Sequence, residues 1–332
     1  MLYFNYHIRR CSMGKIEITL LPEKESLERL LYRLPGNHSR REFIQAEIFK
    51  ATAGKRGEER LYRKLIEFET EEQYRFLKNV CLSRGQWKIQ MDGLLLTERG
   101  AIVIESKNIS GQLYFDDKTG EFSRTNTEGV KTIMDDPTTQ LNKHIRFLTL
   151  FFKQQKIDLP ISGIVVFTAK HCEFLAKPEH HHICKTYQLV DYLFHIIQEF
   201  PLKHTPYDLS EIQKLLEQSR APYERKPLCH LYSIEETELL MGIFCKSCKS
   251  LNMTRKHKKG WVCANCQAVD PLAFRHTIQE YFSLINTHLS NRQLRKFCKL
   301  ESPYVTSRLL AAYELESAGA LRNRTYSIKK KD

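Results

Sequence analysis

The order of apolar and polar residues predicts a chain that begins with helices. Apolar residues recur at helical spacing within residues 15–50, and the run from Pro35 to His38 breaks the pattern. A second helix is predicted from Lys55 to about Leu65. Residues 70–80 suggest a third. The first quarter of the chain is therefore expected to be mainly helical.

The pattern then changes to short apolar runs of the kind that form strands. Residues 87–97 and 101–109 are rich in Ile, Leu and Val, and Glu98-Arg99-Gly100 separates them as a turn. We therefore expect these two runs to pair as a hairpin. Residues 112–115 and 120–124 are predicted to be further strands.

Helices and strands alternate further along the chain. A helix is predicted over residues 137–156, opened by Pro137, followed by a buried strand at 161–168 and a helix at 187–199. Helices alternating with strands in this way indicate an α/β layered fold. Prolines then mark a linker, with a helix at about 208–219.

The C-terminal part returns to helical spacing. Helices are expected at 276–288 and 291–297, the second capped by Ser290. A third is expected to open at Ser302-Pro303, to include Leu315 and to end at Gly319. Residues 320–328 resemble a strand or a wing. This order is similar to a winged helix-turn-helix, although a small helical bundle for protein contacts fits it too.

Composition narrows the partners of the chain. Its 332 residues suggest two or three domains, and 42% hydrophobic residues can form a sizeable core. The sequence has no apolar run long enough to cross a membrane and no recognisable secretory signal, so we expect a cytoplasmic protein without a membrane partner. The net charge of +13 lies mostly in residues 201–332 and favours a polyanion such as nucleic acid.

Two acids and a lysine lie on the predicted hairpin. Side chains two apart on a strand share a face, so Glu105 and Lys107 project together and Ser106 faces the other way. Asp92, on the preceding strand, can lie opposite them. Paired carboxylates suit a divalent cation, and a lysine beside them can orient a water or balance phosphate charge. By spacing alone, a solvated Glu–Lys pair explains the pattern equally well.

The surrounding residues add a resemblance. Residues of about 50–170 resemble the NERD domain, the nuclease-related domain of the PD-(D/E)XK superfamily. Four elements carry the resemblance in order: Gly54-Lys55-Arg56-Gly57-Glu58, Gln90-x-Asp92, Ile104-Glu105-Ser106-Lys107-Asn108 with Gly111, and Asp136-Pro137-x-x-Gln140. Met91 stands where the superfamily name places proline.

The resemblance implies a restriction-endonuclease-like core, a mixed sheet flanked by helices. Asp92 and Glu105 would hold Mg²⁺ or Mn²⁺, and Lys107 would be the catalytic lysine. Glu58 would be an accessory acid on the N-terminal helix, and Gln140 would line the site. The implied activity is metal-dependent hydrolysis of phosphodiester bonds in DNA. The alternative is a nucleic-acid-binding or DNA-end-sensing protein that keeps the nuclease fold without cutting.

Four cysteines predict a second metal site. Cys245, Cys248, Cys263 and Cys266 form two C-x-x-C pairs, a spacing typical of a small zinc ribbon with a closed, structural Zn²⁺. Strand-like runs at 240–244 and 260–262 lie beside the pairs. Metal binding would supply most of the folding energy of so small a unit.

Basic residues near these modules are candidate nucleic-acid contacts. Those between the cysteine pairs can touch phosphates or form a solvated loop. In a winged helix, Tyr304, Thr306, Ser307 and Arg308 would begin the recognition helix. The predicted nucleic-acid contacts are Lys256, Lys258, Lys259, Arg308, Arg322 and Arg324.

The predicted organisation has five segments: a helical extension (1–50), a nuclease-like domain (51–200), a linker with a helix (201–232), a zinc ribbon (233–272) and a winged-helix-like module (273–332). Together they predict a metal-dependent nuclease whose basic C-terminal half holds the substrate. A weaker possibility is a scaffold whose ribbon and helices bind another protein.

Overall fold

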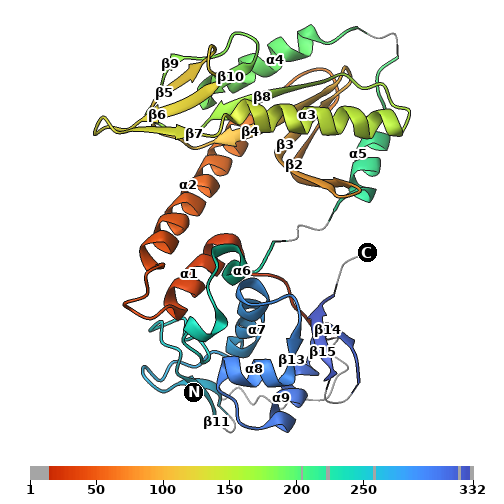
Figure 1. Cartoon of the computed structure of the whole chain (residues 1–332). Coiled ribbons are helices and arrows are strands. Elements are labelled where there is room, and N and C mark those ends of the chain that lie inside the picture. The colour runs from red at the N-terminus through yellow and green to blue at the C-terminus, as the bar shows by residue number, and fades with distance from the viewer. Residues whose placement is uncertain (1–14, 203–204, 222–224, 257–258, 321–322, 330–332) are drawn as a thin grey trace, which may run out of the picture. The chain divides into compact units, whose positions relative to one another are not determined.

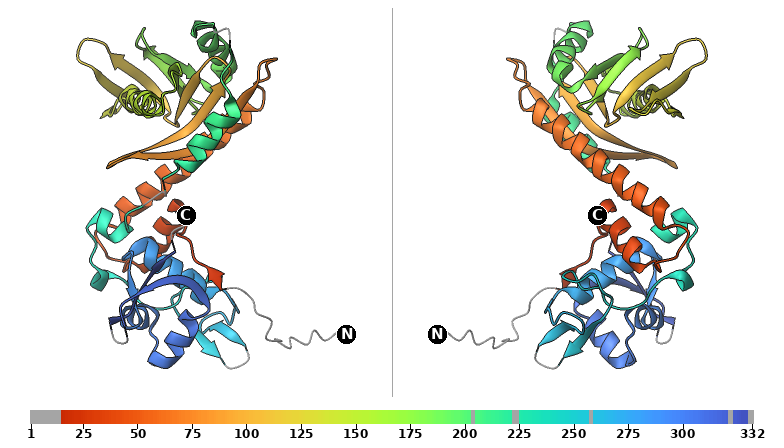
Figure 2. Two further views of the ribbon diagram at one scale, coloured as in Figure 1. Left: turned by 90° about the vertical axis from the view of Figure 1, so that its right-hand side faces the viewer. Right: turned by 90° about the vertical axis from the view of Figure 1, so that its left-hand side faces the viewer.

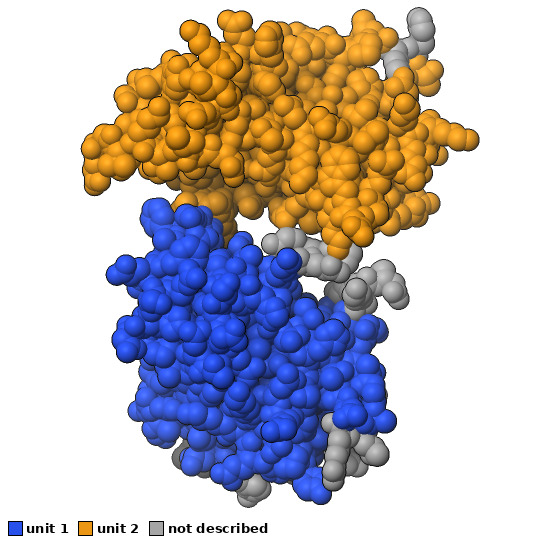
Figure 3. All heavy atoms as spheres, in the orientation of Figure 1, with its two compact units in different colours: residues 1–51, 224–332 blue, residues 52–223 orange. Residues whose placement is uncertain are grey.

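The computed structural model describes residues 15–202, 205–221, 225–256, 259–320 and 323–329 (Figure 1). The chain forms two compact units, shown in different colours in Figure 3. Unit 1 comprises residues 1–51 and 224–332, and unit 2 comprises residues 52–223. Helix α2 (Arg41–Leu65) contributes residues to both. The finer boundaries expected from the sequence stay predictions.

Unit 2 is built on a mixed five-stranded sheet in the order β10-β8-β4-β3-β2. Strands β2, β3 and β4 are antiparallel neighbours, whereas β4, β8 and β10 run parallel. The strands are β2 (Tyr74–Arg84), β3 (Trp87–Thr97), β4 (Ala101–Lys107), β8 (Ile161–Phe167) and β10 (His182–Lys185). The predicted hairpin at 87–109 is confirmed.

Helices cover both faces of this sheet, which explains why its central strands are almost wholly apolar. α3 (Pro137–Gln154) packs on one face through Leu141, Phe147 and Leu148. α4 (Leu189–Glu199) and Leu61 of α2 form the core on the other face. Figure 2 shows α3 end-on beside the sheet.

Smaller elements complete unit 2. A four-stranded sheet has the order β7-β6-β5-β9, and its Phe115 and Phe122 pack against Phe167 of β8. α5 (Leu209–Gln218) packs on β2. The strands of the small sheet are β5 (Gly111–Asp116), β6 (Glu121–Thr125), β7 (Lys131–Met134) and β9 (Cys172–Ala176).

Unit 1 surrounds α7 (Ala273–Leu284), which is buried along most of its length. A four-stranded sheet in the order β1-β14-β15-β13 joins the two ends of the chain, because β1 pairs with β14. The other elements are β1 (Ile16–Glu17), α1 (Glu23–Arg33), α6 (Leu228–Tyr232), β11 (Met253–Lys256), β12 (Gly260–Cys263), β13 (Leu289–Ser290), α8 (Asn291–Cys298), α9 (Pro303–Leu310), β14 (Tyr313–Ala318) and β15 (Thr325–Ile328).

A buried ion network holds α1 against α7. Glu280 of α7 is fully buried and accepts a hydrogen bond from Arg33 Nε at 2.8 Å, while Arg29 Nη1 lies 3.1 Å from its other oxygen. Arg33 also donates to the backbone carbonyls of Leu240 and Gly242. Because buried charges require partners, this network fixes the N-terminal segment to the C-terminal part of the chain.

Several element predictions were wrong. The proposed helix at 70–80 is strand β2, because residues 74–84 pair along their length with β3. The helix predicted from Lys55 begins at Arg41. The strand-like run at 240–244 makes only an isolated bridge, at Ile243, among the residues described. Strands β7, β9 and β10 were not predicted, and they are short or partly polar.

The last predicted helix was too long. α9 ends at Leu310, and Tyr313 to Ala318 form β14, which pairs with β15 and β1. The predicted caps are confirmed, because Ser290 accepts from Gln293 N and Ser302 accepts from Val305 N. Across the described ranges, no helix has the length and apolarity needed to cross a membrane.

Candidate functional site

Asp92 and Glu105 lie where strands β3 and β4 separate. The ladder between these strands ends at the pair Gly93–Ile104, so Asp92 and Glu105 occupy the next opposing positions. β4 remains paired with β8 through Lys107, which holds Glu105 and Lys107 on a central strand. The structure thus places the three predicted residues in one region of the sheet.

Glu105, Lys107 and Gln140 form a hydrogen-bonded group. Lys107 Nζ donates to Glu105 Oε1 and to Gln140 Oε1, both at 2.8 Å. Glu105 is 2% exposed, whereas the Lys107 side chain is 25% exposed. Gln140, which the sequence placed only through a family resemblance, is therefore in direct contact with the lysine, whose partly exposed ammonium group can reach a bound molecule.

The environment of Glu105 favours its protonated form. Burial, and then the negative charge of Asp92, raise the pKa of Glu105 to about 7, although Lys107 opposes this shift. Glu105 Oε2 is buried and has no hydrogen-bond donor within the described ranges. An unpaired buried carboxylate oxygen is the kind of group that a cation would satisfy, so the donor chemistry fits a divalent metal.

Asp92 is anchored by a residue that was predicted to face away. The backbone N–H and the hydroxyl of Ser106 both donate to Asp92 Oδ2, at 2.8 Å and 2.7 Å. The prediction for Ser106 was therefore wrong, because β4 leaves the ladder with β3 before this residue. Tyr62 of α2 donates to the backbone carbonyl of Asp92 at 3.1 Å.

Glu58 lies one helical turn before Tyr62 on α2. Burial raises the pKa of Tyr62 to about 12, and the charges of Glu58 and Asp92 raise it further. Both acids therefore act on the same phenol. Around Asp92 and Glu105, no third His, Cys, Asp or Glu in the described residues brings all three ligand atoms within 4.8 Å of one another. Water or substrate oxygens would have to complete a metal shell there.

His144 is a site residue that the sequence treated only as part of a buried helix face. It follows Gln140 by one turn of α3, and its Nδ1 lies 3.7 Å from Glu105 Oε2. Burial lowers the pKa of His144 to about 4, so the ring is neutral at pH 7. The signal available in the sequence was its i, i+4 spacing from Gln140.

A close helix contact fixes the end of β4. A Cβ on Gly57 would lie 2.7 Å from Thr168 Oγ1 and 2.9 Å from Asn108 Cβ, so only glycine allows this approach. Arg60 donates to the carbonyl of Thr168, and Asn108 donates to that of Ala53. These contacts explain the glycine before Glu58 and fix the backbone directly after Lys107.

The four predicted zinc ligands lie together in unit 1. Their sulfur atoms are all within 4.8 Å of one another, so the cluster can bind a metal ion such as zinc. Cys245–Cys266 and Cys248–Cys263 are separated by 3.7 Å and 3.5 Å. Zinc–sulfur bonds of about 2.3 Å in a tetrahedron place sulfurs about 3.8 Å apart, close to these values.

Hydrogen bonds prepare one of these sulfurs for metal binding. Burial raises the pKa of Cys263, but hydrogen bonds from Ser250 and from the backbone of Cys266 and Asn265 outweigh it and lower that pKa to about 6. The Ala268 backbone lowers the pKa of Cys266, but burial and the neighbouring sulfurs raise it to about 12. A cation would displace the remaining protons.

The candidate nucleic-acid contacts are only partly visible. Lys256, Lys259, Arg308 and Arg324 are exposed, whereas Lys258 and Arg322 lie outside the described residues. Thr306 was expected to approach a ligand from α9, but it is fully buried and its hydroxyl donates to Ser302 O. Tyr304 is 86% exposed at the start of the same helix.

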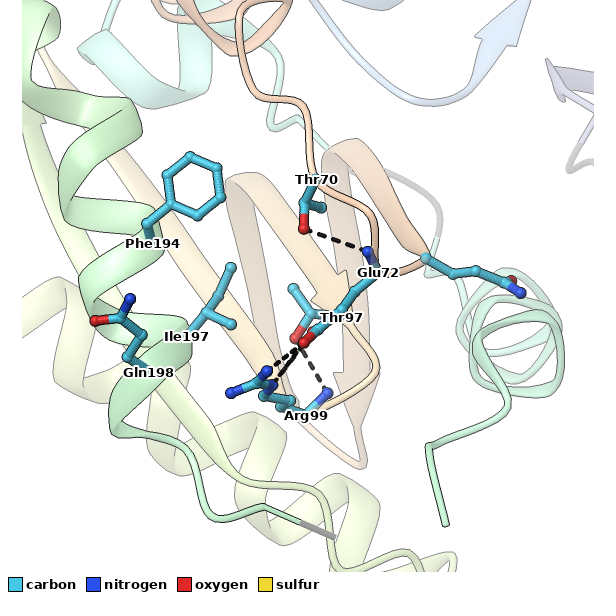
Figure 4. Close-up of a pocket in the computed structure, with 8 residues that line it drawn as sticks. Thr70, Glu72, Thr97, Arg99, Phe194, Ile197 and Gln198 are labelled. Atoms are coloured by element: carbon cyan, nitrogen blue, oxygen red, sulfur yellow. Dashed lines mark hydrogen bonds and ion pairs between the residues drawn. The ribbon is translucent and has the colours of Figure 1, made fainter. Parts of the chain in front are cut away.

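A small pocket in unit 2 contains none of the predicted site residues. It is lined by residues that include Thr70, Thr97, Phe194 and Gln198 (Figure 4). Figure 4 also shows Arg99 paired with Glu72 at its edge. Because this arginine is already neutralised by a carboxylate, the pocket offers no free charge from that pair to a ligand.

Comparison with known proteins identifies one part of the chain. Residues 53–168 match the family model described as the nuclease-related domain, NERD. The match covers less than half of the chain and contains every predicted residue of the acid site. No curated protein is recognisably similar to the chain.

A solved structure, the crystal structure of protein VC1899 from Vibrio cholerae, has 14% sequence identity with this chain and a TM-score of 0.21. The similarity covers 50% of this chain and 36% of that chain. This protein therefore spans little more than a third of the other, and no functional conclusion follows from so low a TM-score.

Proposed function

We propose that this protein is a divalent-metal-dependent nuclease that hydrolyses phosphodiester bonds in DNA, and that unit 2 has a restriction-endonuclease-like core. One observation carries the proposal. Within a segment that matches a nuclease-related domain, Glu105 and Gln140 hold Lys107 beside Asp92 on two central strands. The mixed sheet with helices on both faces supports the proposed core.

Each residue has a distinct role in this proposal. Asp92 and Glu105 would hold Mg²⁺ or Mn²⁺, with Glu58 as an accessory acid. When bound, the cation polarises the scissile phosphate and activates water. Lys107, fixed by Glu105 and Gln140, would place its positive charge beside the phosphate oxygens and orient the attacking water. Ser106 and Tyr62 would keep Asp92 in position.

Cleavage by purified variants tests the proposal. We expect Asp92→Asn, Glu105→Gln and Lys107→Met each to lower Mg²⁺- or Mn²⁺-dependent cleavage of linear, circular or single-stranded DNA by about 100-fold or more, because each removes a charge at the reacting centre. Glu121→Gln changes an exposed carboxylate on β6 and should leave cleavage unchanged. Undiminished cleavage by all three site variants would refute the assignment.

Binding without cleavage is the alternative outcome. If the unaltered protein cuts neither DNA nor RNA with either cation but binds DNA tightly, the site grips or senses nucleic acid. If it neither cuts nor binds, the module for protein contacts is favoured. Affinity that falls steeply with salt separates nucleic-acid binding from the other possibilities, because phosphate contacts release counterions.

We also propose that the cysteine cluster is a structural zinc ribbon. The antiparallel pair β11–β12 carries Cys263 at its end, and Trp261 of β12 stacks on Phe274 of α7 at 5.5 Å. A closed site of four thiolates leaves no position for a substrate, which supports a structural role. Metal analysis of the purified protein should find one zinc ion per chain, and a zinc-free folded protein would contradict the ribbon.

The C-terminal elements support a winged helix-turn-helix. Their order is α7, β13, α8, α9, β14 and β15, with β14–β15 as a hairpin after the third helix. Arg308 on α9 and Arg324 at the start of β15 are exposed and would contact phosphates. We expect Arg308→Ala with Arg324→Ala to lower DNA affinity and the salt slope by about one unit per lost contact. Lys24→Ala, on exposed α1, is the control.

A further inference from the structure

Two buried polar atoms in the acid site face each other without a hydrogen bond. Glu105 Oε2 and His144 Nδ1 both lack a hydrogen-bond partner in the part of the chain that the structure describes. They lie 3.7 Å apart, too far for a hydrogen bond. Leaving such atoms unpaired costs about 1–3 kcal/mol each. Their arrangement therefore calls for a third group between them.

A metal ion fits this separation. Two ligands with bonds of about 2.0–2.2 Å to one cation lie about 3–3.8 Å apart at ordinary coordination angles. Lys107 already occupies the other oxygen of Glu105, at 2.8 Å, so only Oε2 is open to a cation. A lone pair on His144 Nδ1 is available when the ring proton is on Nε2.

We propose that His144 is a ligand of the divalent cation at the acid site, together with Glu105, and that its nitrogen gives the site a preference for Mn²⁺ over Mg²⁺. The inference rests on the proposed function. Imidazole nitrogen suits transition metals, whereas Mg²⁺ takes oxygen ligands almost exclusively. Asp92 does not come within 4.8 Å of both atoms, so Glu105 and His144 define the tightest available pair of ligands.

The position of His144 is fixed by packing of α3. A Cβ on Gly163 would lie 2.6 Å from Leu141 Cδ1, so this glycine lets α3 approach β8 closely. His144 follows Leu141 by one turn and is buried. Gln140, on the same face, is tied to Lys107. The ring is therefore held by a rigid element, which is what a ligand with defined geometry requires.

Pulsed electron paramagnetic resonance of Mn²⁺ tests the proposal on the unaltered full-length protein, purified with its cysteine cluster filled with zinc. A directly bound imidazole produces nitrogen modulation in the Mn²⁺ spectrum. We expect this modulation with Mn²⁺ as the only added metal, and we expect its loss in His144→Gln. Because the first measurement needs no variant, it does not depend on how a substitution affects folding.

Calorimetric titration with Mn²⁺ alone and Mg²⁺ alone gives a second measure. His144→Gln should weaken Mn²⁺ binding by about tenfold or more and Mg²⁺ binding by much less. His180→Gln removes an exposed histidine of the same unit and should change neither affinity.

The outcomes separate this inference from the proposed function. Mn²⁺ binding that requires Glu105 but shows no nitrogen modulation, with an unchanged Mn²⁺/Mg²⁺ ratio in His144→Gln, would overturn the role of His144 and leave the nuclease proposal standing. Absence of any Mn²⁺ or Mg²⁺ binding that depends on Glu105 would overturn both.

Discussion

At the scale of single residues, the two oxygens of Glu105 have different roles. Oε1 accepts from Lys107, while Oε2 is buried without a donor among the residues described. Glu105 is therefore held as a partly protonated acid, and the neutral ring of His144 lies beside it. Such a pair is costly for stability and is typical of a site that binds a charged species.

The pKa of Glu105 predicts how stability changes with pH. Its pKa of about 7 in the folded state exceeds the ordinary 4.5, so the folded protein binds the proton more tightly than the unfolded chain. The resulting stability is fully present below pH 4.5 and is lost as the pH rises through 7. Glu105→Gln cannot lose it. Relative to the unaltered protein, this variant should gain about 3 kcal/mol between pH 4.5 and 8.

Urea unfolding without added divalent ions measures this difference. A Trp261→Phe background leaves Trp87, which packs on Phe147, as the fluorescent reporter of unit 2. His144 shifts stability in the opposite direction between about pH 4 and 6.5, but it does so in both proteins and cancels in the comparison. Parallel pH profiles for the two proteins would contradict the prediction, and Glu121→Gln should give a profile parallel to that of the unaltered protein.

At the scale of elements, α2 and α3 position the site from opposite faces of one sheet. α2 approaches the end of β4 at Gly57, and α3 approaches β8 at Gly163. The residues that carry chemistry follow these contact points directly, at Glu58 and His144. Close helix packing and site geometry are therefore coupled, because a shift of either helix moves a functional side chain.

Two glycines of α2 provide a matched test. Gly57→Ala places a methyl group 2.7 Å from Thr168 Oγ1, so it should lower the unfolding free energy of unit 2 by about 1–3 kcal/mol. Gly54→Ala lies in the same helix with nothing within 4 Å and should raise it by up to about 1 kcal/mol. Urea titration followed by Trp87 measures both, and equal effects of the same sign would show that the contact at Gly57 is unimportant.

At the scale of the whole molecule, residues 1–51 and 224–332 form one unit despite their distance in sequence. The Arg29, Arg33 and Glu280 network and the pairing of β1 with β14 join them. The rings of Phe244 and Phe297 cover the two guanidinium groups, each at 3.9 Å. The N-terminal segment is therefore part of the fold of the C-terminal half.

Breaking this network should destabilise unit 1 strongly. Arg33→Met leaves Glu280 buried with one partner removed, and we expect a loss of about 3–5 kcal/mol. Lys24→Met removes an exposed ion pair with Glu28 on the same helix and should cost at most about 0.5 kcal/mol. Fluorescence of Trp261 in a Trp87→Phe background reports unit 1. Similar losses for both variants would mean that burial of the network contributes nothing.

The sequence by itself predicted the elements whose pattern is local. The apolar runs of β3 and β4, the capping serines of α8 and α9 and the C-x-x-C pairs depend on neighbouring residues alone, and the structure contains them where they were expected. Asp92, Glu105 and Lys107 could also be placed, because strand alternation and one hairpin turn determine their relation.

Only the tertiary structure decided the rest. β2 was mistaken for a helix and β14 for the end of one, because their strands are stabilised by partners far along the chain. Ser106 and His144 joined the acid site through the separation of β3 from β4 and through the packing of α3 on the sheet. The buried environment of Glu105 likewise arises from contacts between distant segments, which no local pattern encodes.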